Sequence, residues 1–169
     1  MGVPEEHRRG APSKLSYSIF VVSTSRFSDK DKEDLTGKIA VEIVETSGNL
    51  VVRKEIIPDD EGLIRASLIR AAEDSDVIIF CGGTGVSPSD VTPEAVRPLL
   101  KKELPGFGEI FRWLSYSQIG SSAIASRASA GFYLKSLVFM LPGSPDAVKL
   151  ALERLIIPEA PHLIKLARG

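Results

Sequence analysis

A glycine-dense run gives the clearest chemical signal in this sequence. Residues 82–85 read Gly-Gly-Thr-Gly and directly follow the apolar run Val77–Cys81. A buried strand that leads into a loop of small residues, and then into a helix opening at Thr92-Pro93-Glu94, leaves backbone N–H groups free to bind an anion. The pattern therefore indicates a ligand that carries phosphate.

A simpler interpretation stays open, because glycines also follow strands wherever the chain turns tightly with a positive φ. The sequence contains no Gly-x-x-x-x-Gly-Lys-Ser/Thr loop and, after this strand, no Gly-x-Gly-x-x-Gly fingerprint. We therefore expect any nucleotide to be held by neither a P-loop nor a dinucleotide-binding turn. Asp90 favours a functional loop, because it places a carboxylate within a few residues of the glycines.

Asp59 and Asp90 are the candidate catalytic residues, since each follows an apolar run. Phosphoryl and nucleotidyl transfer need the phosphate charge to be neutralised, and Mg²⁺ is commonly held by one or two carboxylates together with substrate oxygens. The two aspartates are therefore also the candidate Mg²⁺ ligands. Helix capping is the alternative; it suits Asp60 well, and it suits Asp90 less because Thr92 and Pro93 already open the next helix.

Arg127 is the candidate cation for a phosphate group, because a planar guanidinium binds phosphate oxygens bidentately. A surface ion pair explains the same residue equally well. His7 and His162 lie near the two ends of the chain, so we set aside hydrolases that use a histidine triad. Cys81, at a strand end, is expected to be a small buried side chain.

Composition limits the classes of protein further. The 169 residues suit one domain, and 43% hydrophobic with 25% charged residues is ordinary for a globular protein. A formal charge of −1, without a cluster of Lys and Arg, predicts neither nucleic-acid nor membrane binding. Phe111 and Trp113 are accordingly expected in the core or in subunit contacts rather than stacked on bases. With one cysteine, no signal peptide and no apolar run of membrane-spanning length, we expect a cytoplasmic protein.

Hydrophobic periodicity predicts alternating strands and helices in one domain, residues 15–169, after a flexible tail, residues 1–14. Polar segments 23–26, 58–60 and 82–90 follow three of the strands. In an open parallel sheet they meet at one edge, where ligands bind. Strands are expected at 17–23, 50–57, 77–81 and 137–141, and helices at 31–45, 61–73, 92–103, 109–117 and 146–157, the last stopped by Pro158 and Pro161.

Several short motifs, taken together and in order, resemble the MoaB/Mog family of molybdenum cofactor biosynthesis proteins. The resemblance covers about residues 17–160, and no single motif would carry it alone. The motifs are Ile57-Pro58-Asp59-Asp60, Gly82-Gly83-Thr84-Gly85 with Asp90-Val91-Thr92-Pro93-Glu94-Ala95, Pro105-Gly106-Phe107-Gly108-Glu109, Ser126-Arg127-Ala128 and Leu141-Pro142-Gly143-Ser144-Pro145.

The resemblance implies a three-layer α/β sandwich with a mostly parallel central sheet, assembled as a homotrimer or homohexamer. It implies that the terminal phosphate of molybdopterin attacks the α-phosphate of ATP in the presence of Mg²⁺, giving adenylylated molybdopterin and pyrophosphate. The product would pass to a downstream metal-insertion protein that adds molybdenum or tungsten. Asp59 and Asp90 match the family's two functionally important aspartates, and residues 82–85 and 142–145 match its ligand loops.

The substrate-binding and nucleotide-binding candidates come from the polar segments at the expected edge and from the matched motifs. They are Ser23, Gly82, Gly83, Thr84, Gly85, Ser87, Thr92, Arg127, Pro142, Gly143, Ser144 and Pro145.

Three functions stay open at this point. A molybdopterin adenylyltransferase is the leading hypothesis. A non-catalytic protein that binds molybdopterin or acts as a scaffold is the second, because Ser89 stands where many relatives carry arginine. A nucleotide hydrolase on a related fold is the third.

Overall fold

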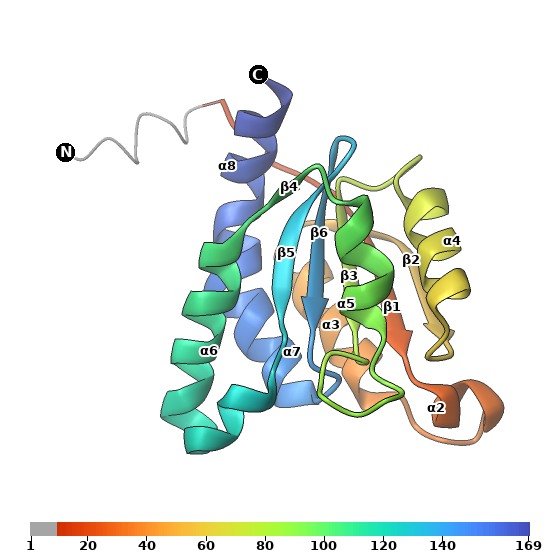
Figure 1. Cartoon of the computed structure of the whole chain (residues 1–169). Coiled ribbons are helices and arrows are strands. Elements are labelled where there is room, and N and C mark those ends of the chain that lie inside the picture. Colours follow the sequence, from red (N-terminus) through yellow and green to blue (C-terminus); the bar gives the residue numbers. More distant parts are fainter. Residues whose placement is uncertain (1–9) are drawn as a thin grey trace.

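The computed structural model describes residues 10–169, which contain a six-stranded sheet in the order β2-β1-β3-β6-β5-β4 (Figure 1). Strands β2, β1, β3 and β6 run parallel, whereas β5 and β4 pair antiparallel at one side. The expected mostly parallel sheet is therefore confirmed. The strands are β1 (Ser16–Val22), β2 (Leu50–Ile57), β3 (Val77–Cys81), β4 (Lys102–Glu103), β5 (Ser129–Tyr133) and β6 (Ser136–Leu141).

Helices cover both faces of the sheet and produce the three layers. Neighbouring residues of one strand point to opposite faces, so Ile79 packs in the core beneath α3, α6, α7 and α8, whereas Ile78 packs in the core beneath α4 and α5. Both side chains are fully buried. The helices are α2 (Thr24–Ser28), α3 (Leu35–Thr46), α4 (Glu61–Ala71), α5 (Thr92–Val96), α6 (Pro105–Ile119), α7 (Pro145–Ala151) and α8 (Ile157–Arg168).

Capping side chains set the starts of α3, α4 and α7. Asp34 accepts a hydrogen bond from Gly37 N–H and starts α3, four residues later than the periodicity predicts. Asp60 accepts one from Leu63 N–H at 2.8 Å and starts α4, which confirms the capping prediction for this residue. Ser144 caps α7 in the same way. Each cap satisfies an N–H group that has no partner inside its helix.

The predicted helix over 92–103 is wrong beyond Val96. The chain passes through a 3₁₀ turn, η1 (Arg97–Leu99), and then extends, because Lys101 N–H and Leu104 N–H donate to Phe132 and Ala130 carbonyls of β5 at 2.8 Å. Strand β5 itself was missed, since its first residues, Ser129 and Ala130, belong to the small, polar stretch 121–130. Pairing with distant residues outweighed local helix preference here.

The sequence predicts a break in helical structure around Pro105. Pro105 instead occupies the first turn of α6, where a missing N–H is harmless. Pro158 and Pro161 do not end the last helix either. Helix α7 continues through a π-helical turn, η3 (Leu152–Ile156), into α8, which carries Pro161 inside it. The fully buried Ile156, Ala160 and Ile164 explain this, because their packing offsets the lost backbone hydrogen bonds.

Three further predictions concern exposure and the tail. Phe111 is 1% exposed in the core, as predicted, but Trp113 is 69% exposed, so a core position is wrong for it. Residues 1–9 of the predicted tail lie outside the described residues, and residues 10–14 form neither helix nor strand. Within residues 10–169, no helix combines the length and the apolar character needed to cross a membrane.

Candidate functional site

The candidate site lies at the carboxyl edge of the parallel strands, the lower end of the molecule in Figure 1. Strands β2, β1, β3 and β6 are consecutive neighbours, so the segments that follow them also lie side by side. Those segments carry Asp59, Ser23, the run from Gly82 to Asp90, and Pro142 to Pro145. The predicted convergence of separate polar segments on one edge is confirmed.

The glycine loop needs glycine at its first two positions. Gly82 has φ +119° and Gly83 has φ +64°, and a Cβ on Gly82 would lie 2.2 Å from the carbonyl oxygen of Val22. Gly82 N–H donates to the carbonyl of Leu141 at 2.9 Å. The loop is therefore pressed against the ends of two neighbouring strands, where any side chain would collide with backbone.

Thr92 anchors this loop from the start of α5. Its hydroxyl donates to the Gly82 carbonyl at 2.8 Å, and its N–H donates to the Gly83 carbonyl at 3.0 Å. Thr92 is fully buried. In this arrangement the Thr92 hydroxyl shapes the glycine loop, and ligand contact by Thr92 stays a prediction.

Asp90 closes the segment Gly85–Asp90, which we call the 85–90 loop. Its Oδ2 accepts a hydrogen bond from Ser87 N–H at 2.9 Å, and its own N–H donates to the Ser87 carbonyl at 2.9 Å. No side chain caps α5, so the capping alternative for Asp90 is wrong. The carboxylate lies beside Gly85, where a Cβ would come within 2.8 Å of Oδ2.

Asp59 is held on the other side of the glycine loop. Its Oδ2 accepts hydrogen bonds from both the N–H and the hydroxyl of Thr24, each at 2.8 Å, and Asp59 N–H donates back to that hydroxyl at 3.0 Å. A Cβ on Gly83 would lie 3.3 Å from Asp59 Oδ1. Both predicted aspartates thus flank the glycine loop in fixed orientations.

Ser23 starts a short helix, α2, where the sequence predicts an irregular loop. Ser23 Oγ accepts a hydrogen bond from Arg26 N–H at 3.4 Å and lies 3.3 Å from Ser25 Oγ. Its role here is that of a helix cap, and this start of α2 also places Thr24 against Asp59. Contact between Ser23 and a ligand stays a prediction.

Arg127 is engaged by protein groups rather than left free. Its Nε donates to the Gly85 carbonyl at 2.7 Å, its Nη2 donates to the Asp90 carbonyl at 2.8 Å, and its Nη1 forms an ion pair with Glu94. The ion pair was the alternative to a phosphate contact. Hydrogen bonding from Arg127 is also the main reason that the pKa of Glu94 lies below its usual value.

A cavity of about 270 Å³ opens beside the glycine loop, and we call it the edge cavity. Seven of the predicted site residues line it, whereas Ser23, Asp59, Gly82, Ser87, Thr92, Arg127 and Pro145 do not. The predicted residues in its wall are Gly83, Thr84, Gly85, Asp90, Pro142, Gly143 and Ser144.

Sequence reasoning missed the wall that α6 and the 3₁₀ turn η2 (Gly120–Ala125) contribute. The tract of small residues around 121–130 was the available signal, because small side chains leave room beside a ligand. The residues missed are Phe111, Ser115, Ile119, Ser122, Ala123, Ala125, Ser126 and, from α7, Ala147.

The donor groups at this edge decide how a divalent cation could be held. Among residues 10–169, no cluster of three or more His, Cys, Asp or Glu could hold a metal ion. Mg²⁺ binding by Asp59 and Asp90 stays a prediction, which rests on the chemistry of Mg²⁺: the ion needs one or two carboxylates and takes its other oxygens from substrate phosphates and water. Cys81 is fully buried in β3, as predicted, and burial, with a smaller contribution from Asp34, raises the pKa of its thiol to about 12.

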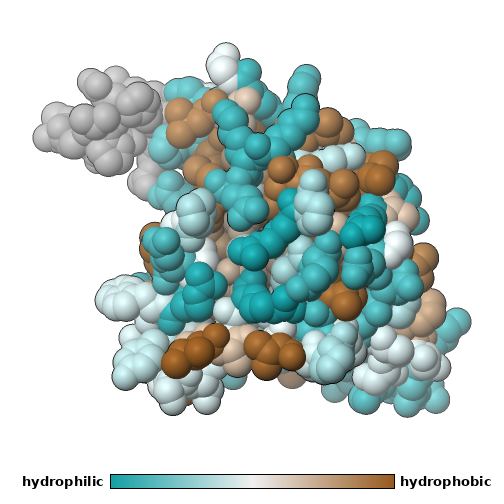
Figure 2. All heavy atoms as spheres, in the orientation of Figure 1, coloured by the Kyte–Doolittle hydropathy of each residue, from teal (hydrophilic) through white to brown (hydrophobic). Residues whose placement is uncertain are grey.

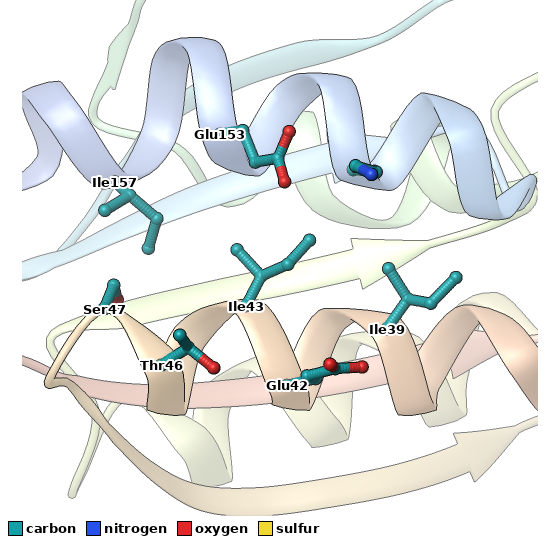
Figure 3. A pocket seen from close by; sticks show the side chains of 8 residues that line it. Ile39, Glu42, Ile43, Thr46, Ser47, Glu153 and Ile157 are labelled. Atoms are coloured by element: carbon teal, nitrogen blue, oxygen red, sulfur yellow. The ribbon is translucent and has the colours of Figure 1, made fainter.

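A larger hollow of about 500 Å³ lies elsewhere, between α3 and the continuous helix from α7 to α8, and we call it the helix groove. Ile39 and Ile43 point from α3 toward the opposite helix, which carries Glu153 and Ile157 (Figure 3). The helix groove contains no glycine loop and no fixed pair of carboxylates. We therefore assign the candidate site to the smaller edge cavity.

The face of the molecule seen in Figure 2 is mainly hydrophilic, with separate hydrophobic spots, some of which lie near its lower border. In the same orientation, that border corresponds to the carboxyl edge of the sheet in Figure 1. Ligand sites commonly combine apolar walls with a few fixed polar groups.

The fold and the site define a class: an α/β protein with a small-molecule site at the carboxyl edge of its sheet. A family model described as a probable molybdopterin binding domain matches residues 18–162. The molybdenum cofactor biosynthesis protein B of Bacillus subtilis is 42% identical over 167 residues, which cover 97% of this chain and 96% of that protein. The Staphylococcus carnosus protein of that name is 46% identical over 155 residues, 89% of each chain.

Solved structures agree with these sequence relatives. The crystal structure of the tungsten cofactor synthesizing protein MoaB from Pyrococcus furiosus superposes with a TM-score of 0.86 at 35% identity. The match covers 94% of this chain and 100% of that one. The chain belongs to the MoaB/Mog family of molybdenum cofactor biosynthesis proteins.

Proposed function

We propose that this protein binds molybdopterin at the edge cavity and transfers AMP from ATP to its terminal phosphate. One observation carries the proposal: two immobilised carboxylates, Asp59 and Asp90, flank a glycine loop beside the cavity. Fixed carboxylates at a phosphate-binding loop are the groups that nucleotidyl transfer uses. Membership in the family supports the choice of pterin as substrate.

The reaction needs little covalent chemistry from the protein. A terminal phosphate oxygen of molybdopterin attacks the α-phosphorus of ATP, the bond from that phosphorus to the bridging oxygen breaks, and pyrophosphate leaves. A phosphate monoester is largely ionised near neutral pH, so the protein does not have to remove a proton from the nucleophile. Its task is to place two phosphate groups in line and to compensate their charge.

Different residues at the edge serve the placement of the phosphates and the compensation of their charge. The backbone N–H groups around Gly83 and Gly85 are placed to meet phosphate oxygens, since the loop of small residues lets a ligand approach closely. Asp59 and Asp90 would hold Mg²⁺, which supplies charge neutralisation on the phosphates when bound. Thr24 orients Asp59, and the Ser87 N–H orients Asp90.

Non-catalytic pterin binding is the second candidate function, and Arg127 favours it. The side chain that sequence reasoning assigned to phosphate is bonded to Gly85 and Asp90 and paired with Glu94, so part of its charge is already compensated within the protein. A protein that only carries molybdopterin to a metal-insertion partner would need less charge compensation than an enzyme that joins two phosphate compounds.

We also propose that the protein forms a homotrimer or homohexamer through α6. Trp113 is 69% exposed and Tyr116 is 63% exposed on this helix, and Ile110 and Ile119 extend the apolar surface at three-residue spacing. Large exposed apolar surfaces of this kind commonly mark subunit contacts. Sedimentation velocity of the purified protein, compared with a Trp113→Glu variant, tests this; an unchanged assembly in the variant would exclude α6 as the contact.

The direct test of function is incubation of the purified protein with molybdopterin, ATP and Mg²⁺, followed by measurement of pyrophosphate and adenylylated pterin. We expect both products, and we expect neither when pterin or Mg²⁺ is omitted. Tight pterin binding without products would establish the carrier. Release of AMP or phosphate from nucleotide without pterin would instead reveal a hydrolase.

A further inference from the structure

Arg127 connects the two ends of the 85–90 loop. Its backbone N–H donates to the Thr84 carbonyl at 2.9 Å, which places the side chain beside the loop. From there Nε reaches the Gly85 carbonyl at 2.7 Å and Nη2 reaches the Asp90 carbonyl at 2.8 Å. A single guanidinium therefore bridges the first and last residues of the loop.

Glu94 completes the arrangement from α5. Its carboxylate pairs with Nη1 of Arg127, so it neutralises the guanidinium and fixes its orientation. A planar guanidinium has the several divergent donors that this geometry needs, whereas an ammonium group on a flexible stem does not. The Arg127 side chain is 32% exposed, so the pair is partly shielded from water.

From this geometry we infer that Arg127 is a positioning residue, which sets the orientation of the Asp90 carboxylate by closing the 85–90 loop, and not a phosphate ligand. The inference rests on the proposed function only for its kinetic consequence. One hydrogen bond within the loop also holds the carboxylate, since Ser87 N–H donates to Asp90 Oδ2. Arg127 adds hydrogen bonds from outside the loop, which hold Gly85 and Asp90 together.

The alternative is that Arg127 binds a substrate phosphate directly. Three of its five N–H donors already bond to Gly85, Asp90 and Glu94, so a phosphate would have to bind through the remaining N–H groups of Nη1 and Nη2, with Glu94 close to the anion. Removing Glu94 would free the guanidinium and strengthen phosphate binding. The positioning role predicts no such gain in phosphate binding, because loss of Glu94 leaves Arg127 less firmly oriented toward the Gly85 and Asp90 carbonyls.

Amide hydrogen exchange tests the loop without any substrate. In Arg127→Ala and Arg127→Lys we expect the Ser87 and Asp90 N–H groups to exchange faster by roughly ten- to a hundredfold, the range for loss of one or two charge-assisted hydrogen bonds. Glu94→Gln should show a smaller increase of the same kind. Arg97→Ala is the matched control, since Arg97 is a nearby cation whose ion pair is with Glu103. Unchanged exchange in both Arg127 variants would overturn the inference.

Kinetics separate positioning from ligand binding. We expect Arg127→Lys to lower kcat by roughly ten- to a hundredfold, because small misplacements of catalytic groups cost rates of that order, while KM for ATP changes less than about threefold. In an Asp90→Asn background, Arg127→Lys should cause little further loss, since it acts through Asp90. A raised KM with unchanged kcat, or full additivity with Asp90→Asn, would contradict the inference.

The two readouts distinguish failure of the inference from failure of the proposed function. If the wild-type protein binds pterin without turnover, the kinetic measurement is replaced by the pterin dissociation constant, and the exchange experiment still decides whether Arg127 closes the loop. If Arg127→Ala does not fold, Arg127→Lys and Glu94→Gln provide the same comparison, because each keeps a side chain of similar size.

Discussion

The helix groove is larger than the edge cavity, but the edge cavity has the chemical groups expected of a binding site. The helix groove is the larger, about 500 Å³ against about 270 Å³, and it lies between two helices that line it with three isoleucines and several polar side chains. The edge cavity is smaller, but it borders a glycine loop with positive φ angles. It also borders Asp90, whose carboxylate accepts a hydrogen bond from a backbone N–H. Fixed polar groups that converge, rather than volume, mark the candidate site.

The difference follows from how the two regions are built. Side chains on helix surfaces form the helix groove, and their charged tips lie in water, where they are held loosely. Loops that follow β3 and β6 form one wall of the edge cavity, opposite α6 and η2, and these two strands are buried along their whole length. A rigid support for exposed functional loops is what precise placement of catalytic groups requires.

Replacement of Asp90 should show the largest effect. Asp90→Ala is expected to lower turnover by roughly a hundredfold or more, because Asp90 would hold the Mg²⁺ that neutralises the reacting phosphates, and loss of such charge stabilisation costs several kcal/mol. Stability should fall by only about 1 kcal/mol, the value of its hydrogen bond to Ser87. Product formation and thermal unfolding measure the two effects. Asp60→Asn is the control, because asparagine caps a helix nearly as well; equal turnover in the two variants would refute the assignment.

Replacement of Gly82 should disrupt the edge cavity through the backbone. Gly82→Ala puts a Cβ 2.2 Å from the Val22 carbonyl oxygen at φ +119°, so we expect a loss of about 2–4 kcal/mol in the free energy of unfolding. Gly106→Ala is the matched control, since a Cβ there meets no atom within 4 Å. Chemical denaturation measures both, and equal stability of the two variants would show that the loop can shift.

The ion pair of Glu94 with Arg127 predicts a pH dependence. The pKa of Glu94 in the folded protein lies below its ordinary value of 4.5, so the pair stabilises the fold above about pH 4.5. That contribution is lost as the pH falls through the lowered pKa of the folded state. The stability difference between wild type and Glu94→Gln, about 0.2–1 kcal/mol for an exposed pair, should therefore vanish in acid. A difference that grows in acid would have the wrong sign.

The smallest effect is expected in the helix groove. Glu42→Gln and Glu153→Gln alter exposed side chains that line it, so stability should change by less than about 0.5 kcal/mol and turnover should not change. Calorimetric titration with molybdopterin should give the wild-type affinity. Loss of pterin binding in either variant would reverse the comparison and make the helix groove the binding region.

Much of the fold was predictable because local pattern and tertiary structure agree. Val77–Cys81 is an uninterrupted apolar run and forms the fully buried strand β3, and Asp60 is both a good capping residue and the cap of α4. Prediction failed where distant contacts decided. Strand β5 exists because it pairs with β6 and β4, and Pro161 stays within α8 because neighbouring side chains are buried.

The candidate site shows the same division. Gly82, Gly83, Asp59 and Asp90 could be found from residue type, since only glycine suits the backbone here and carboxylates are the groups that commonly hold Mg²⁺ at phosphates. The wall made by α6 and η2 could not be found, because its serines and alanines have no distinctive chemistry. The partners of Arg127 were also undecidable, since a guanidinium suits a phosphate and a carboxylate equally well.

The sequence by itself determined the order of strands and helices around the parallel part of the sheet, the glycine loop and the two aspartates, because these depend on local periodicity and on residue chemistry. Only the tertiary structure decided that Thr24 holds Asp59, that Arg127 bridges the 85–90 loop, and that small residues from a distant helix wall the edge cavity. The physical reason is that such contacts join residues 30 or more positions apart, and no local preference encodes which distant partner a polar group will meet.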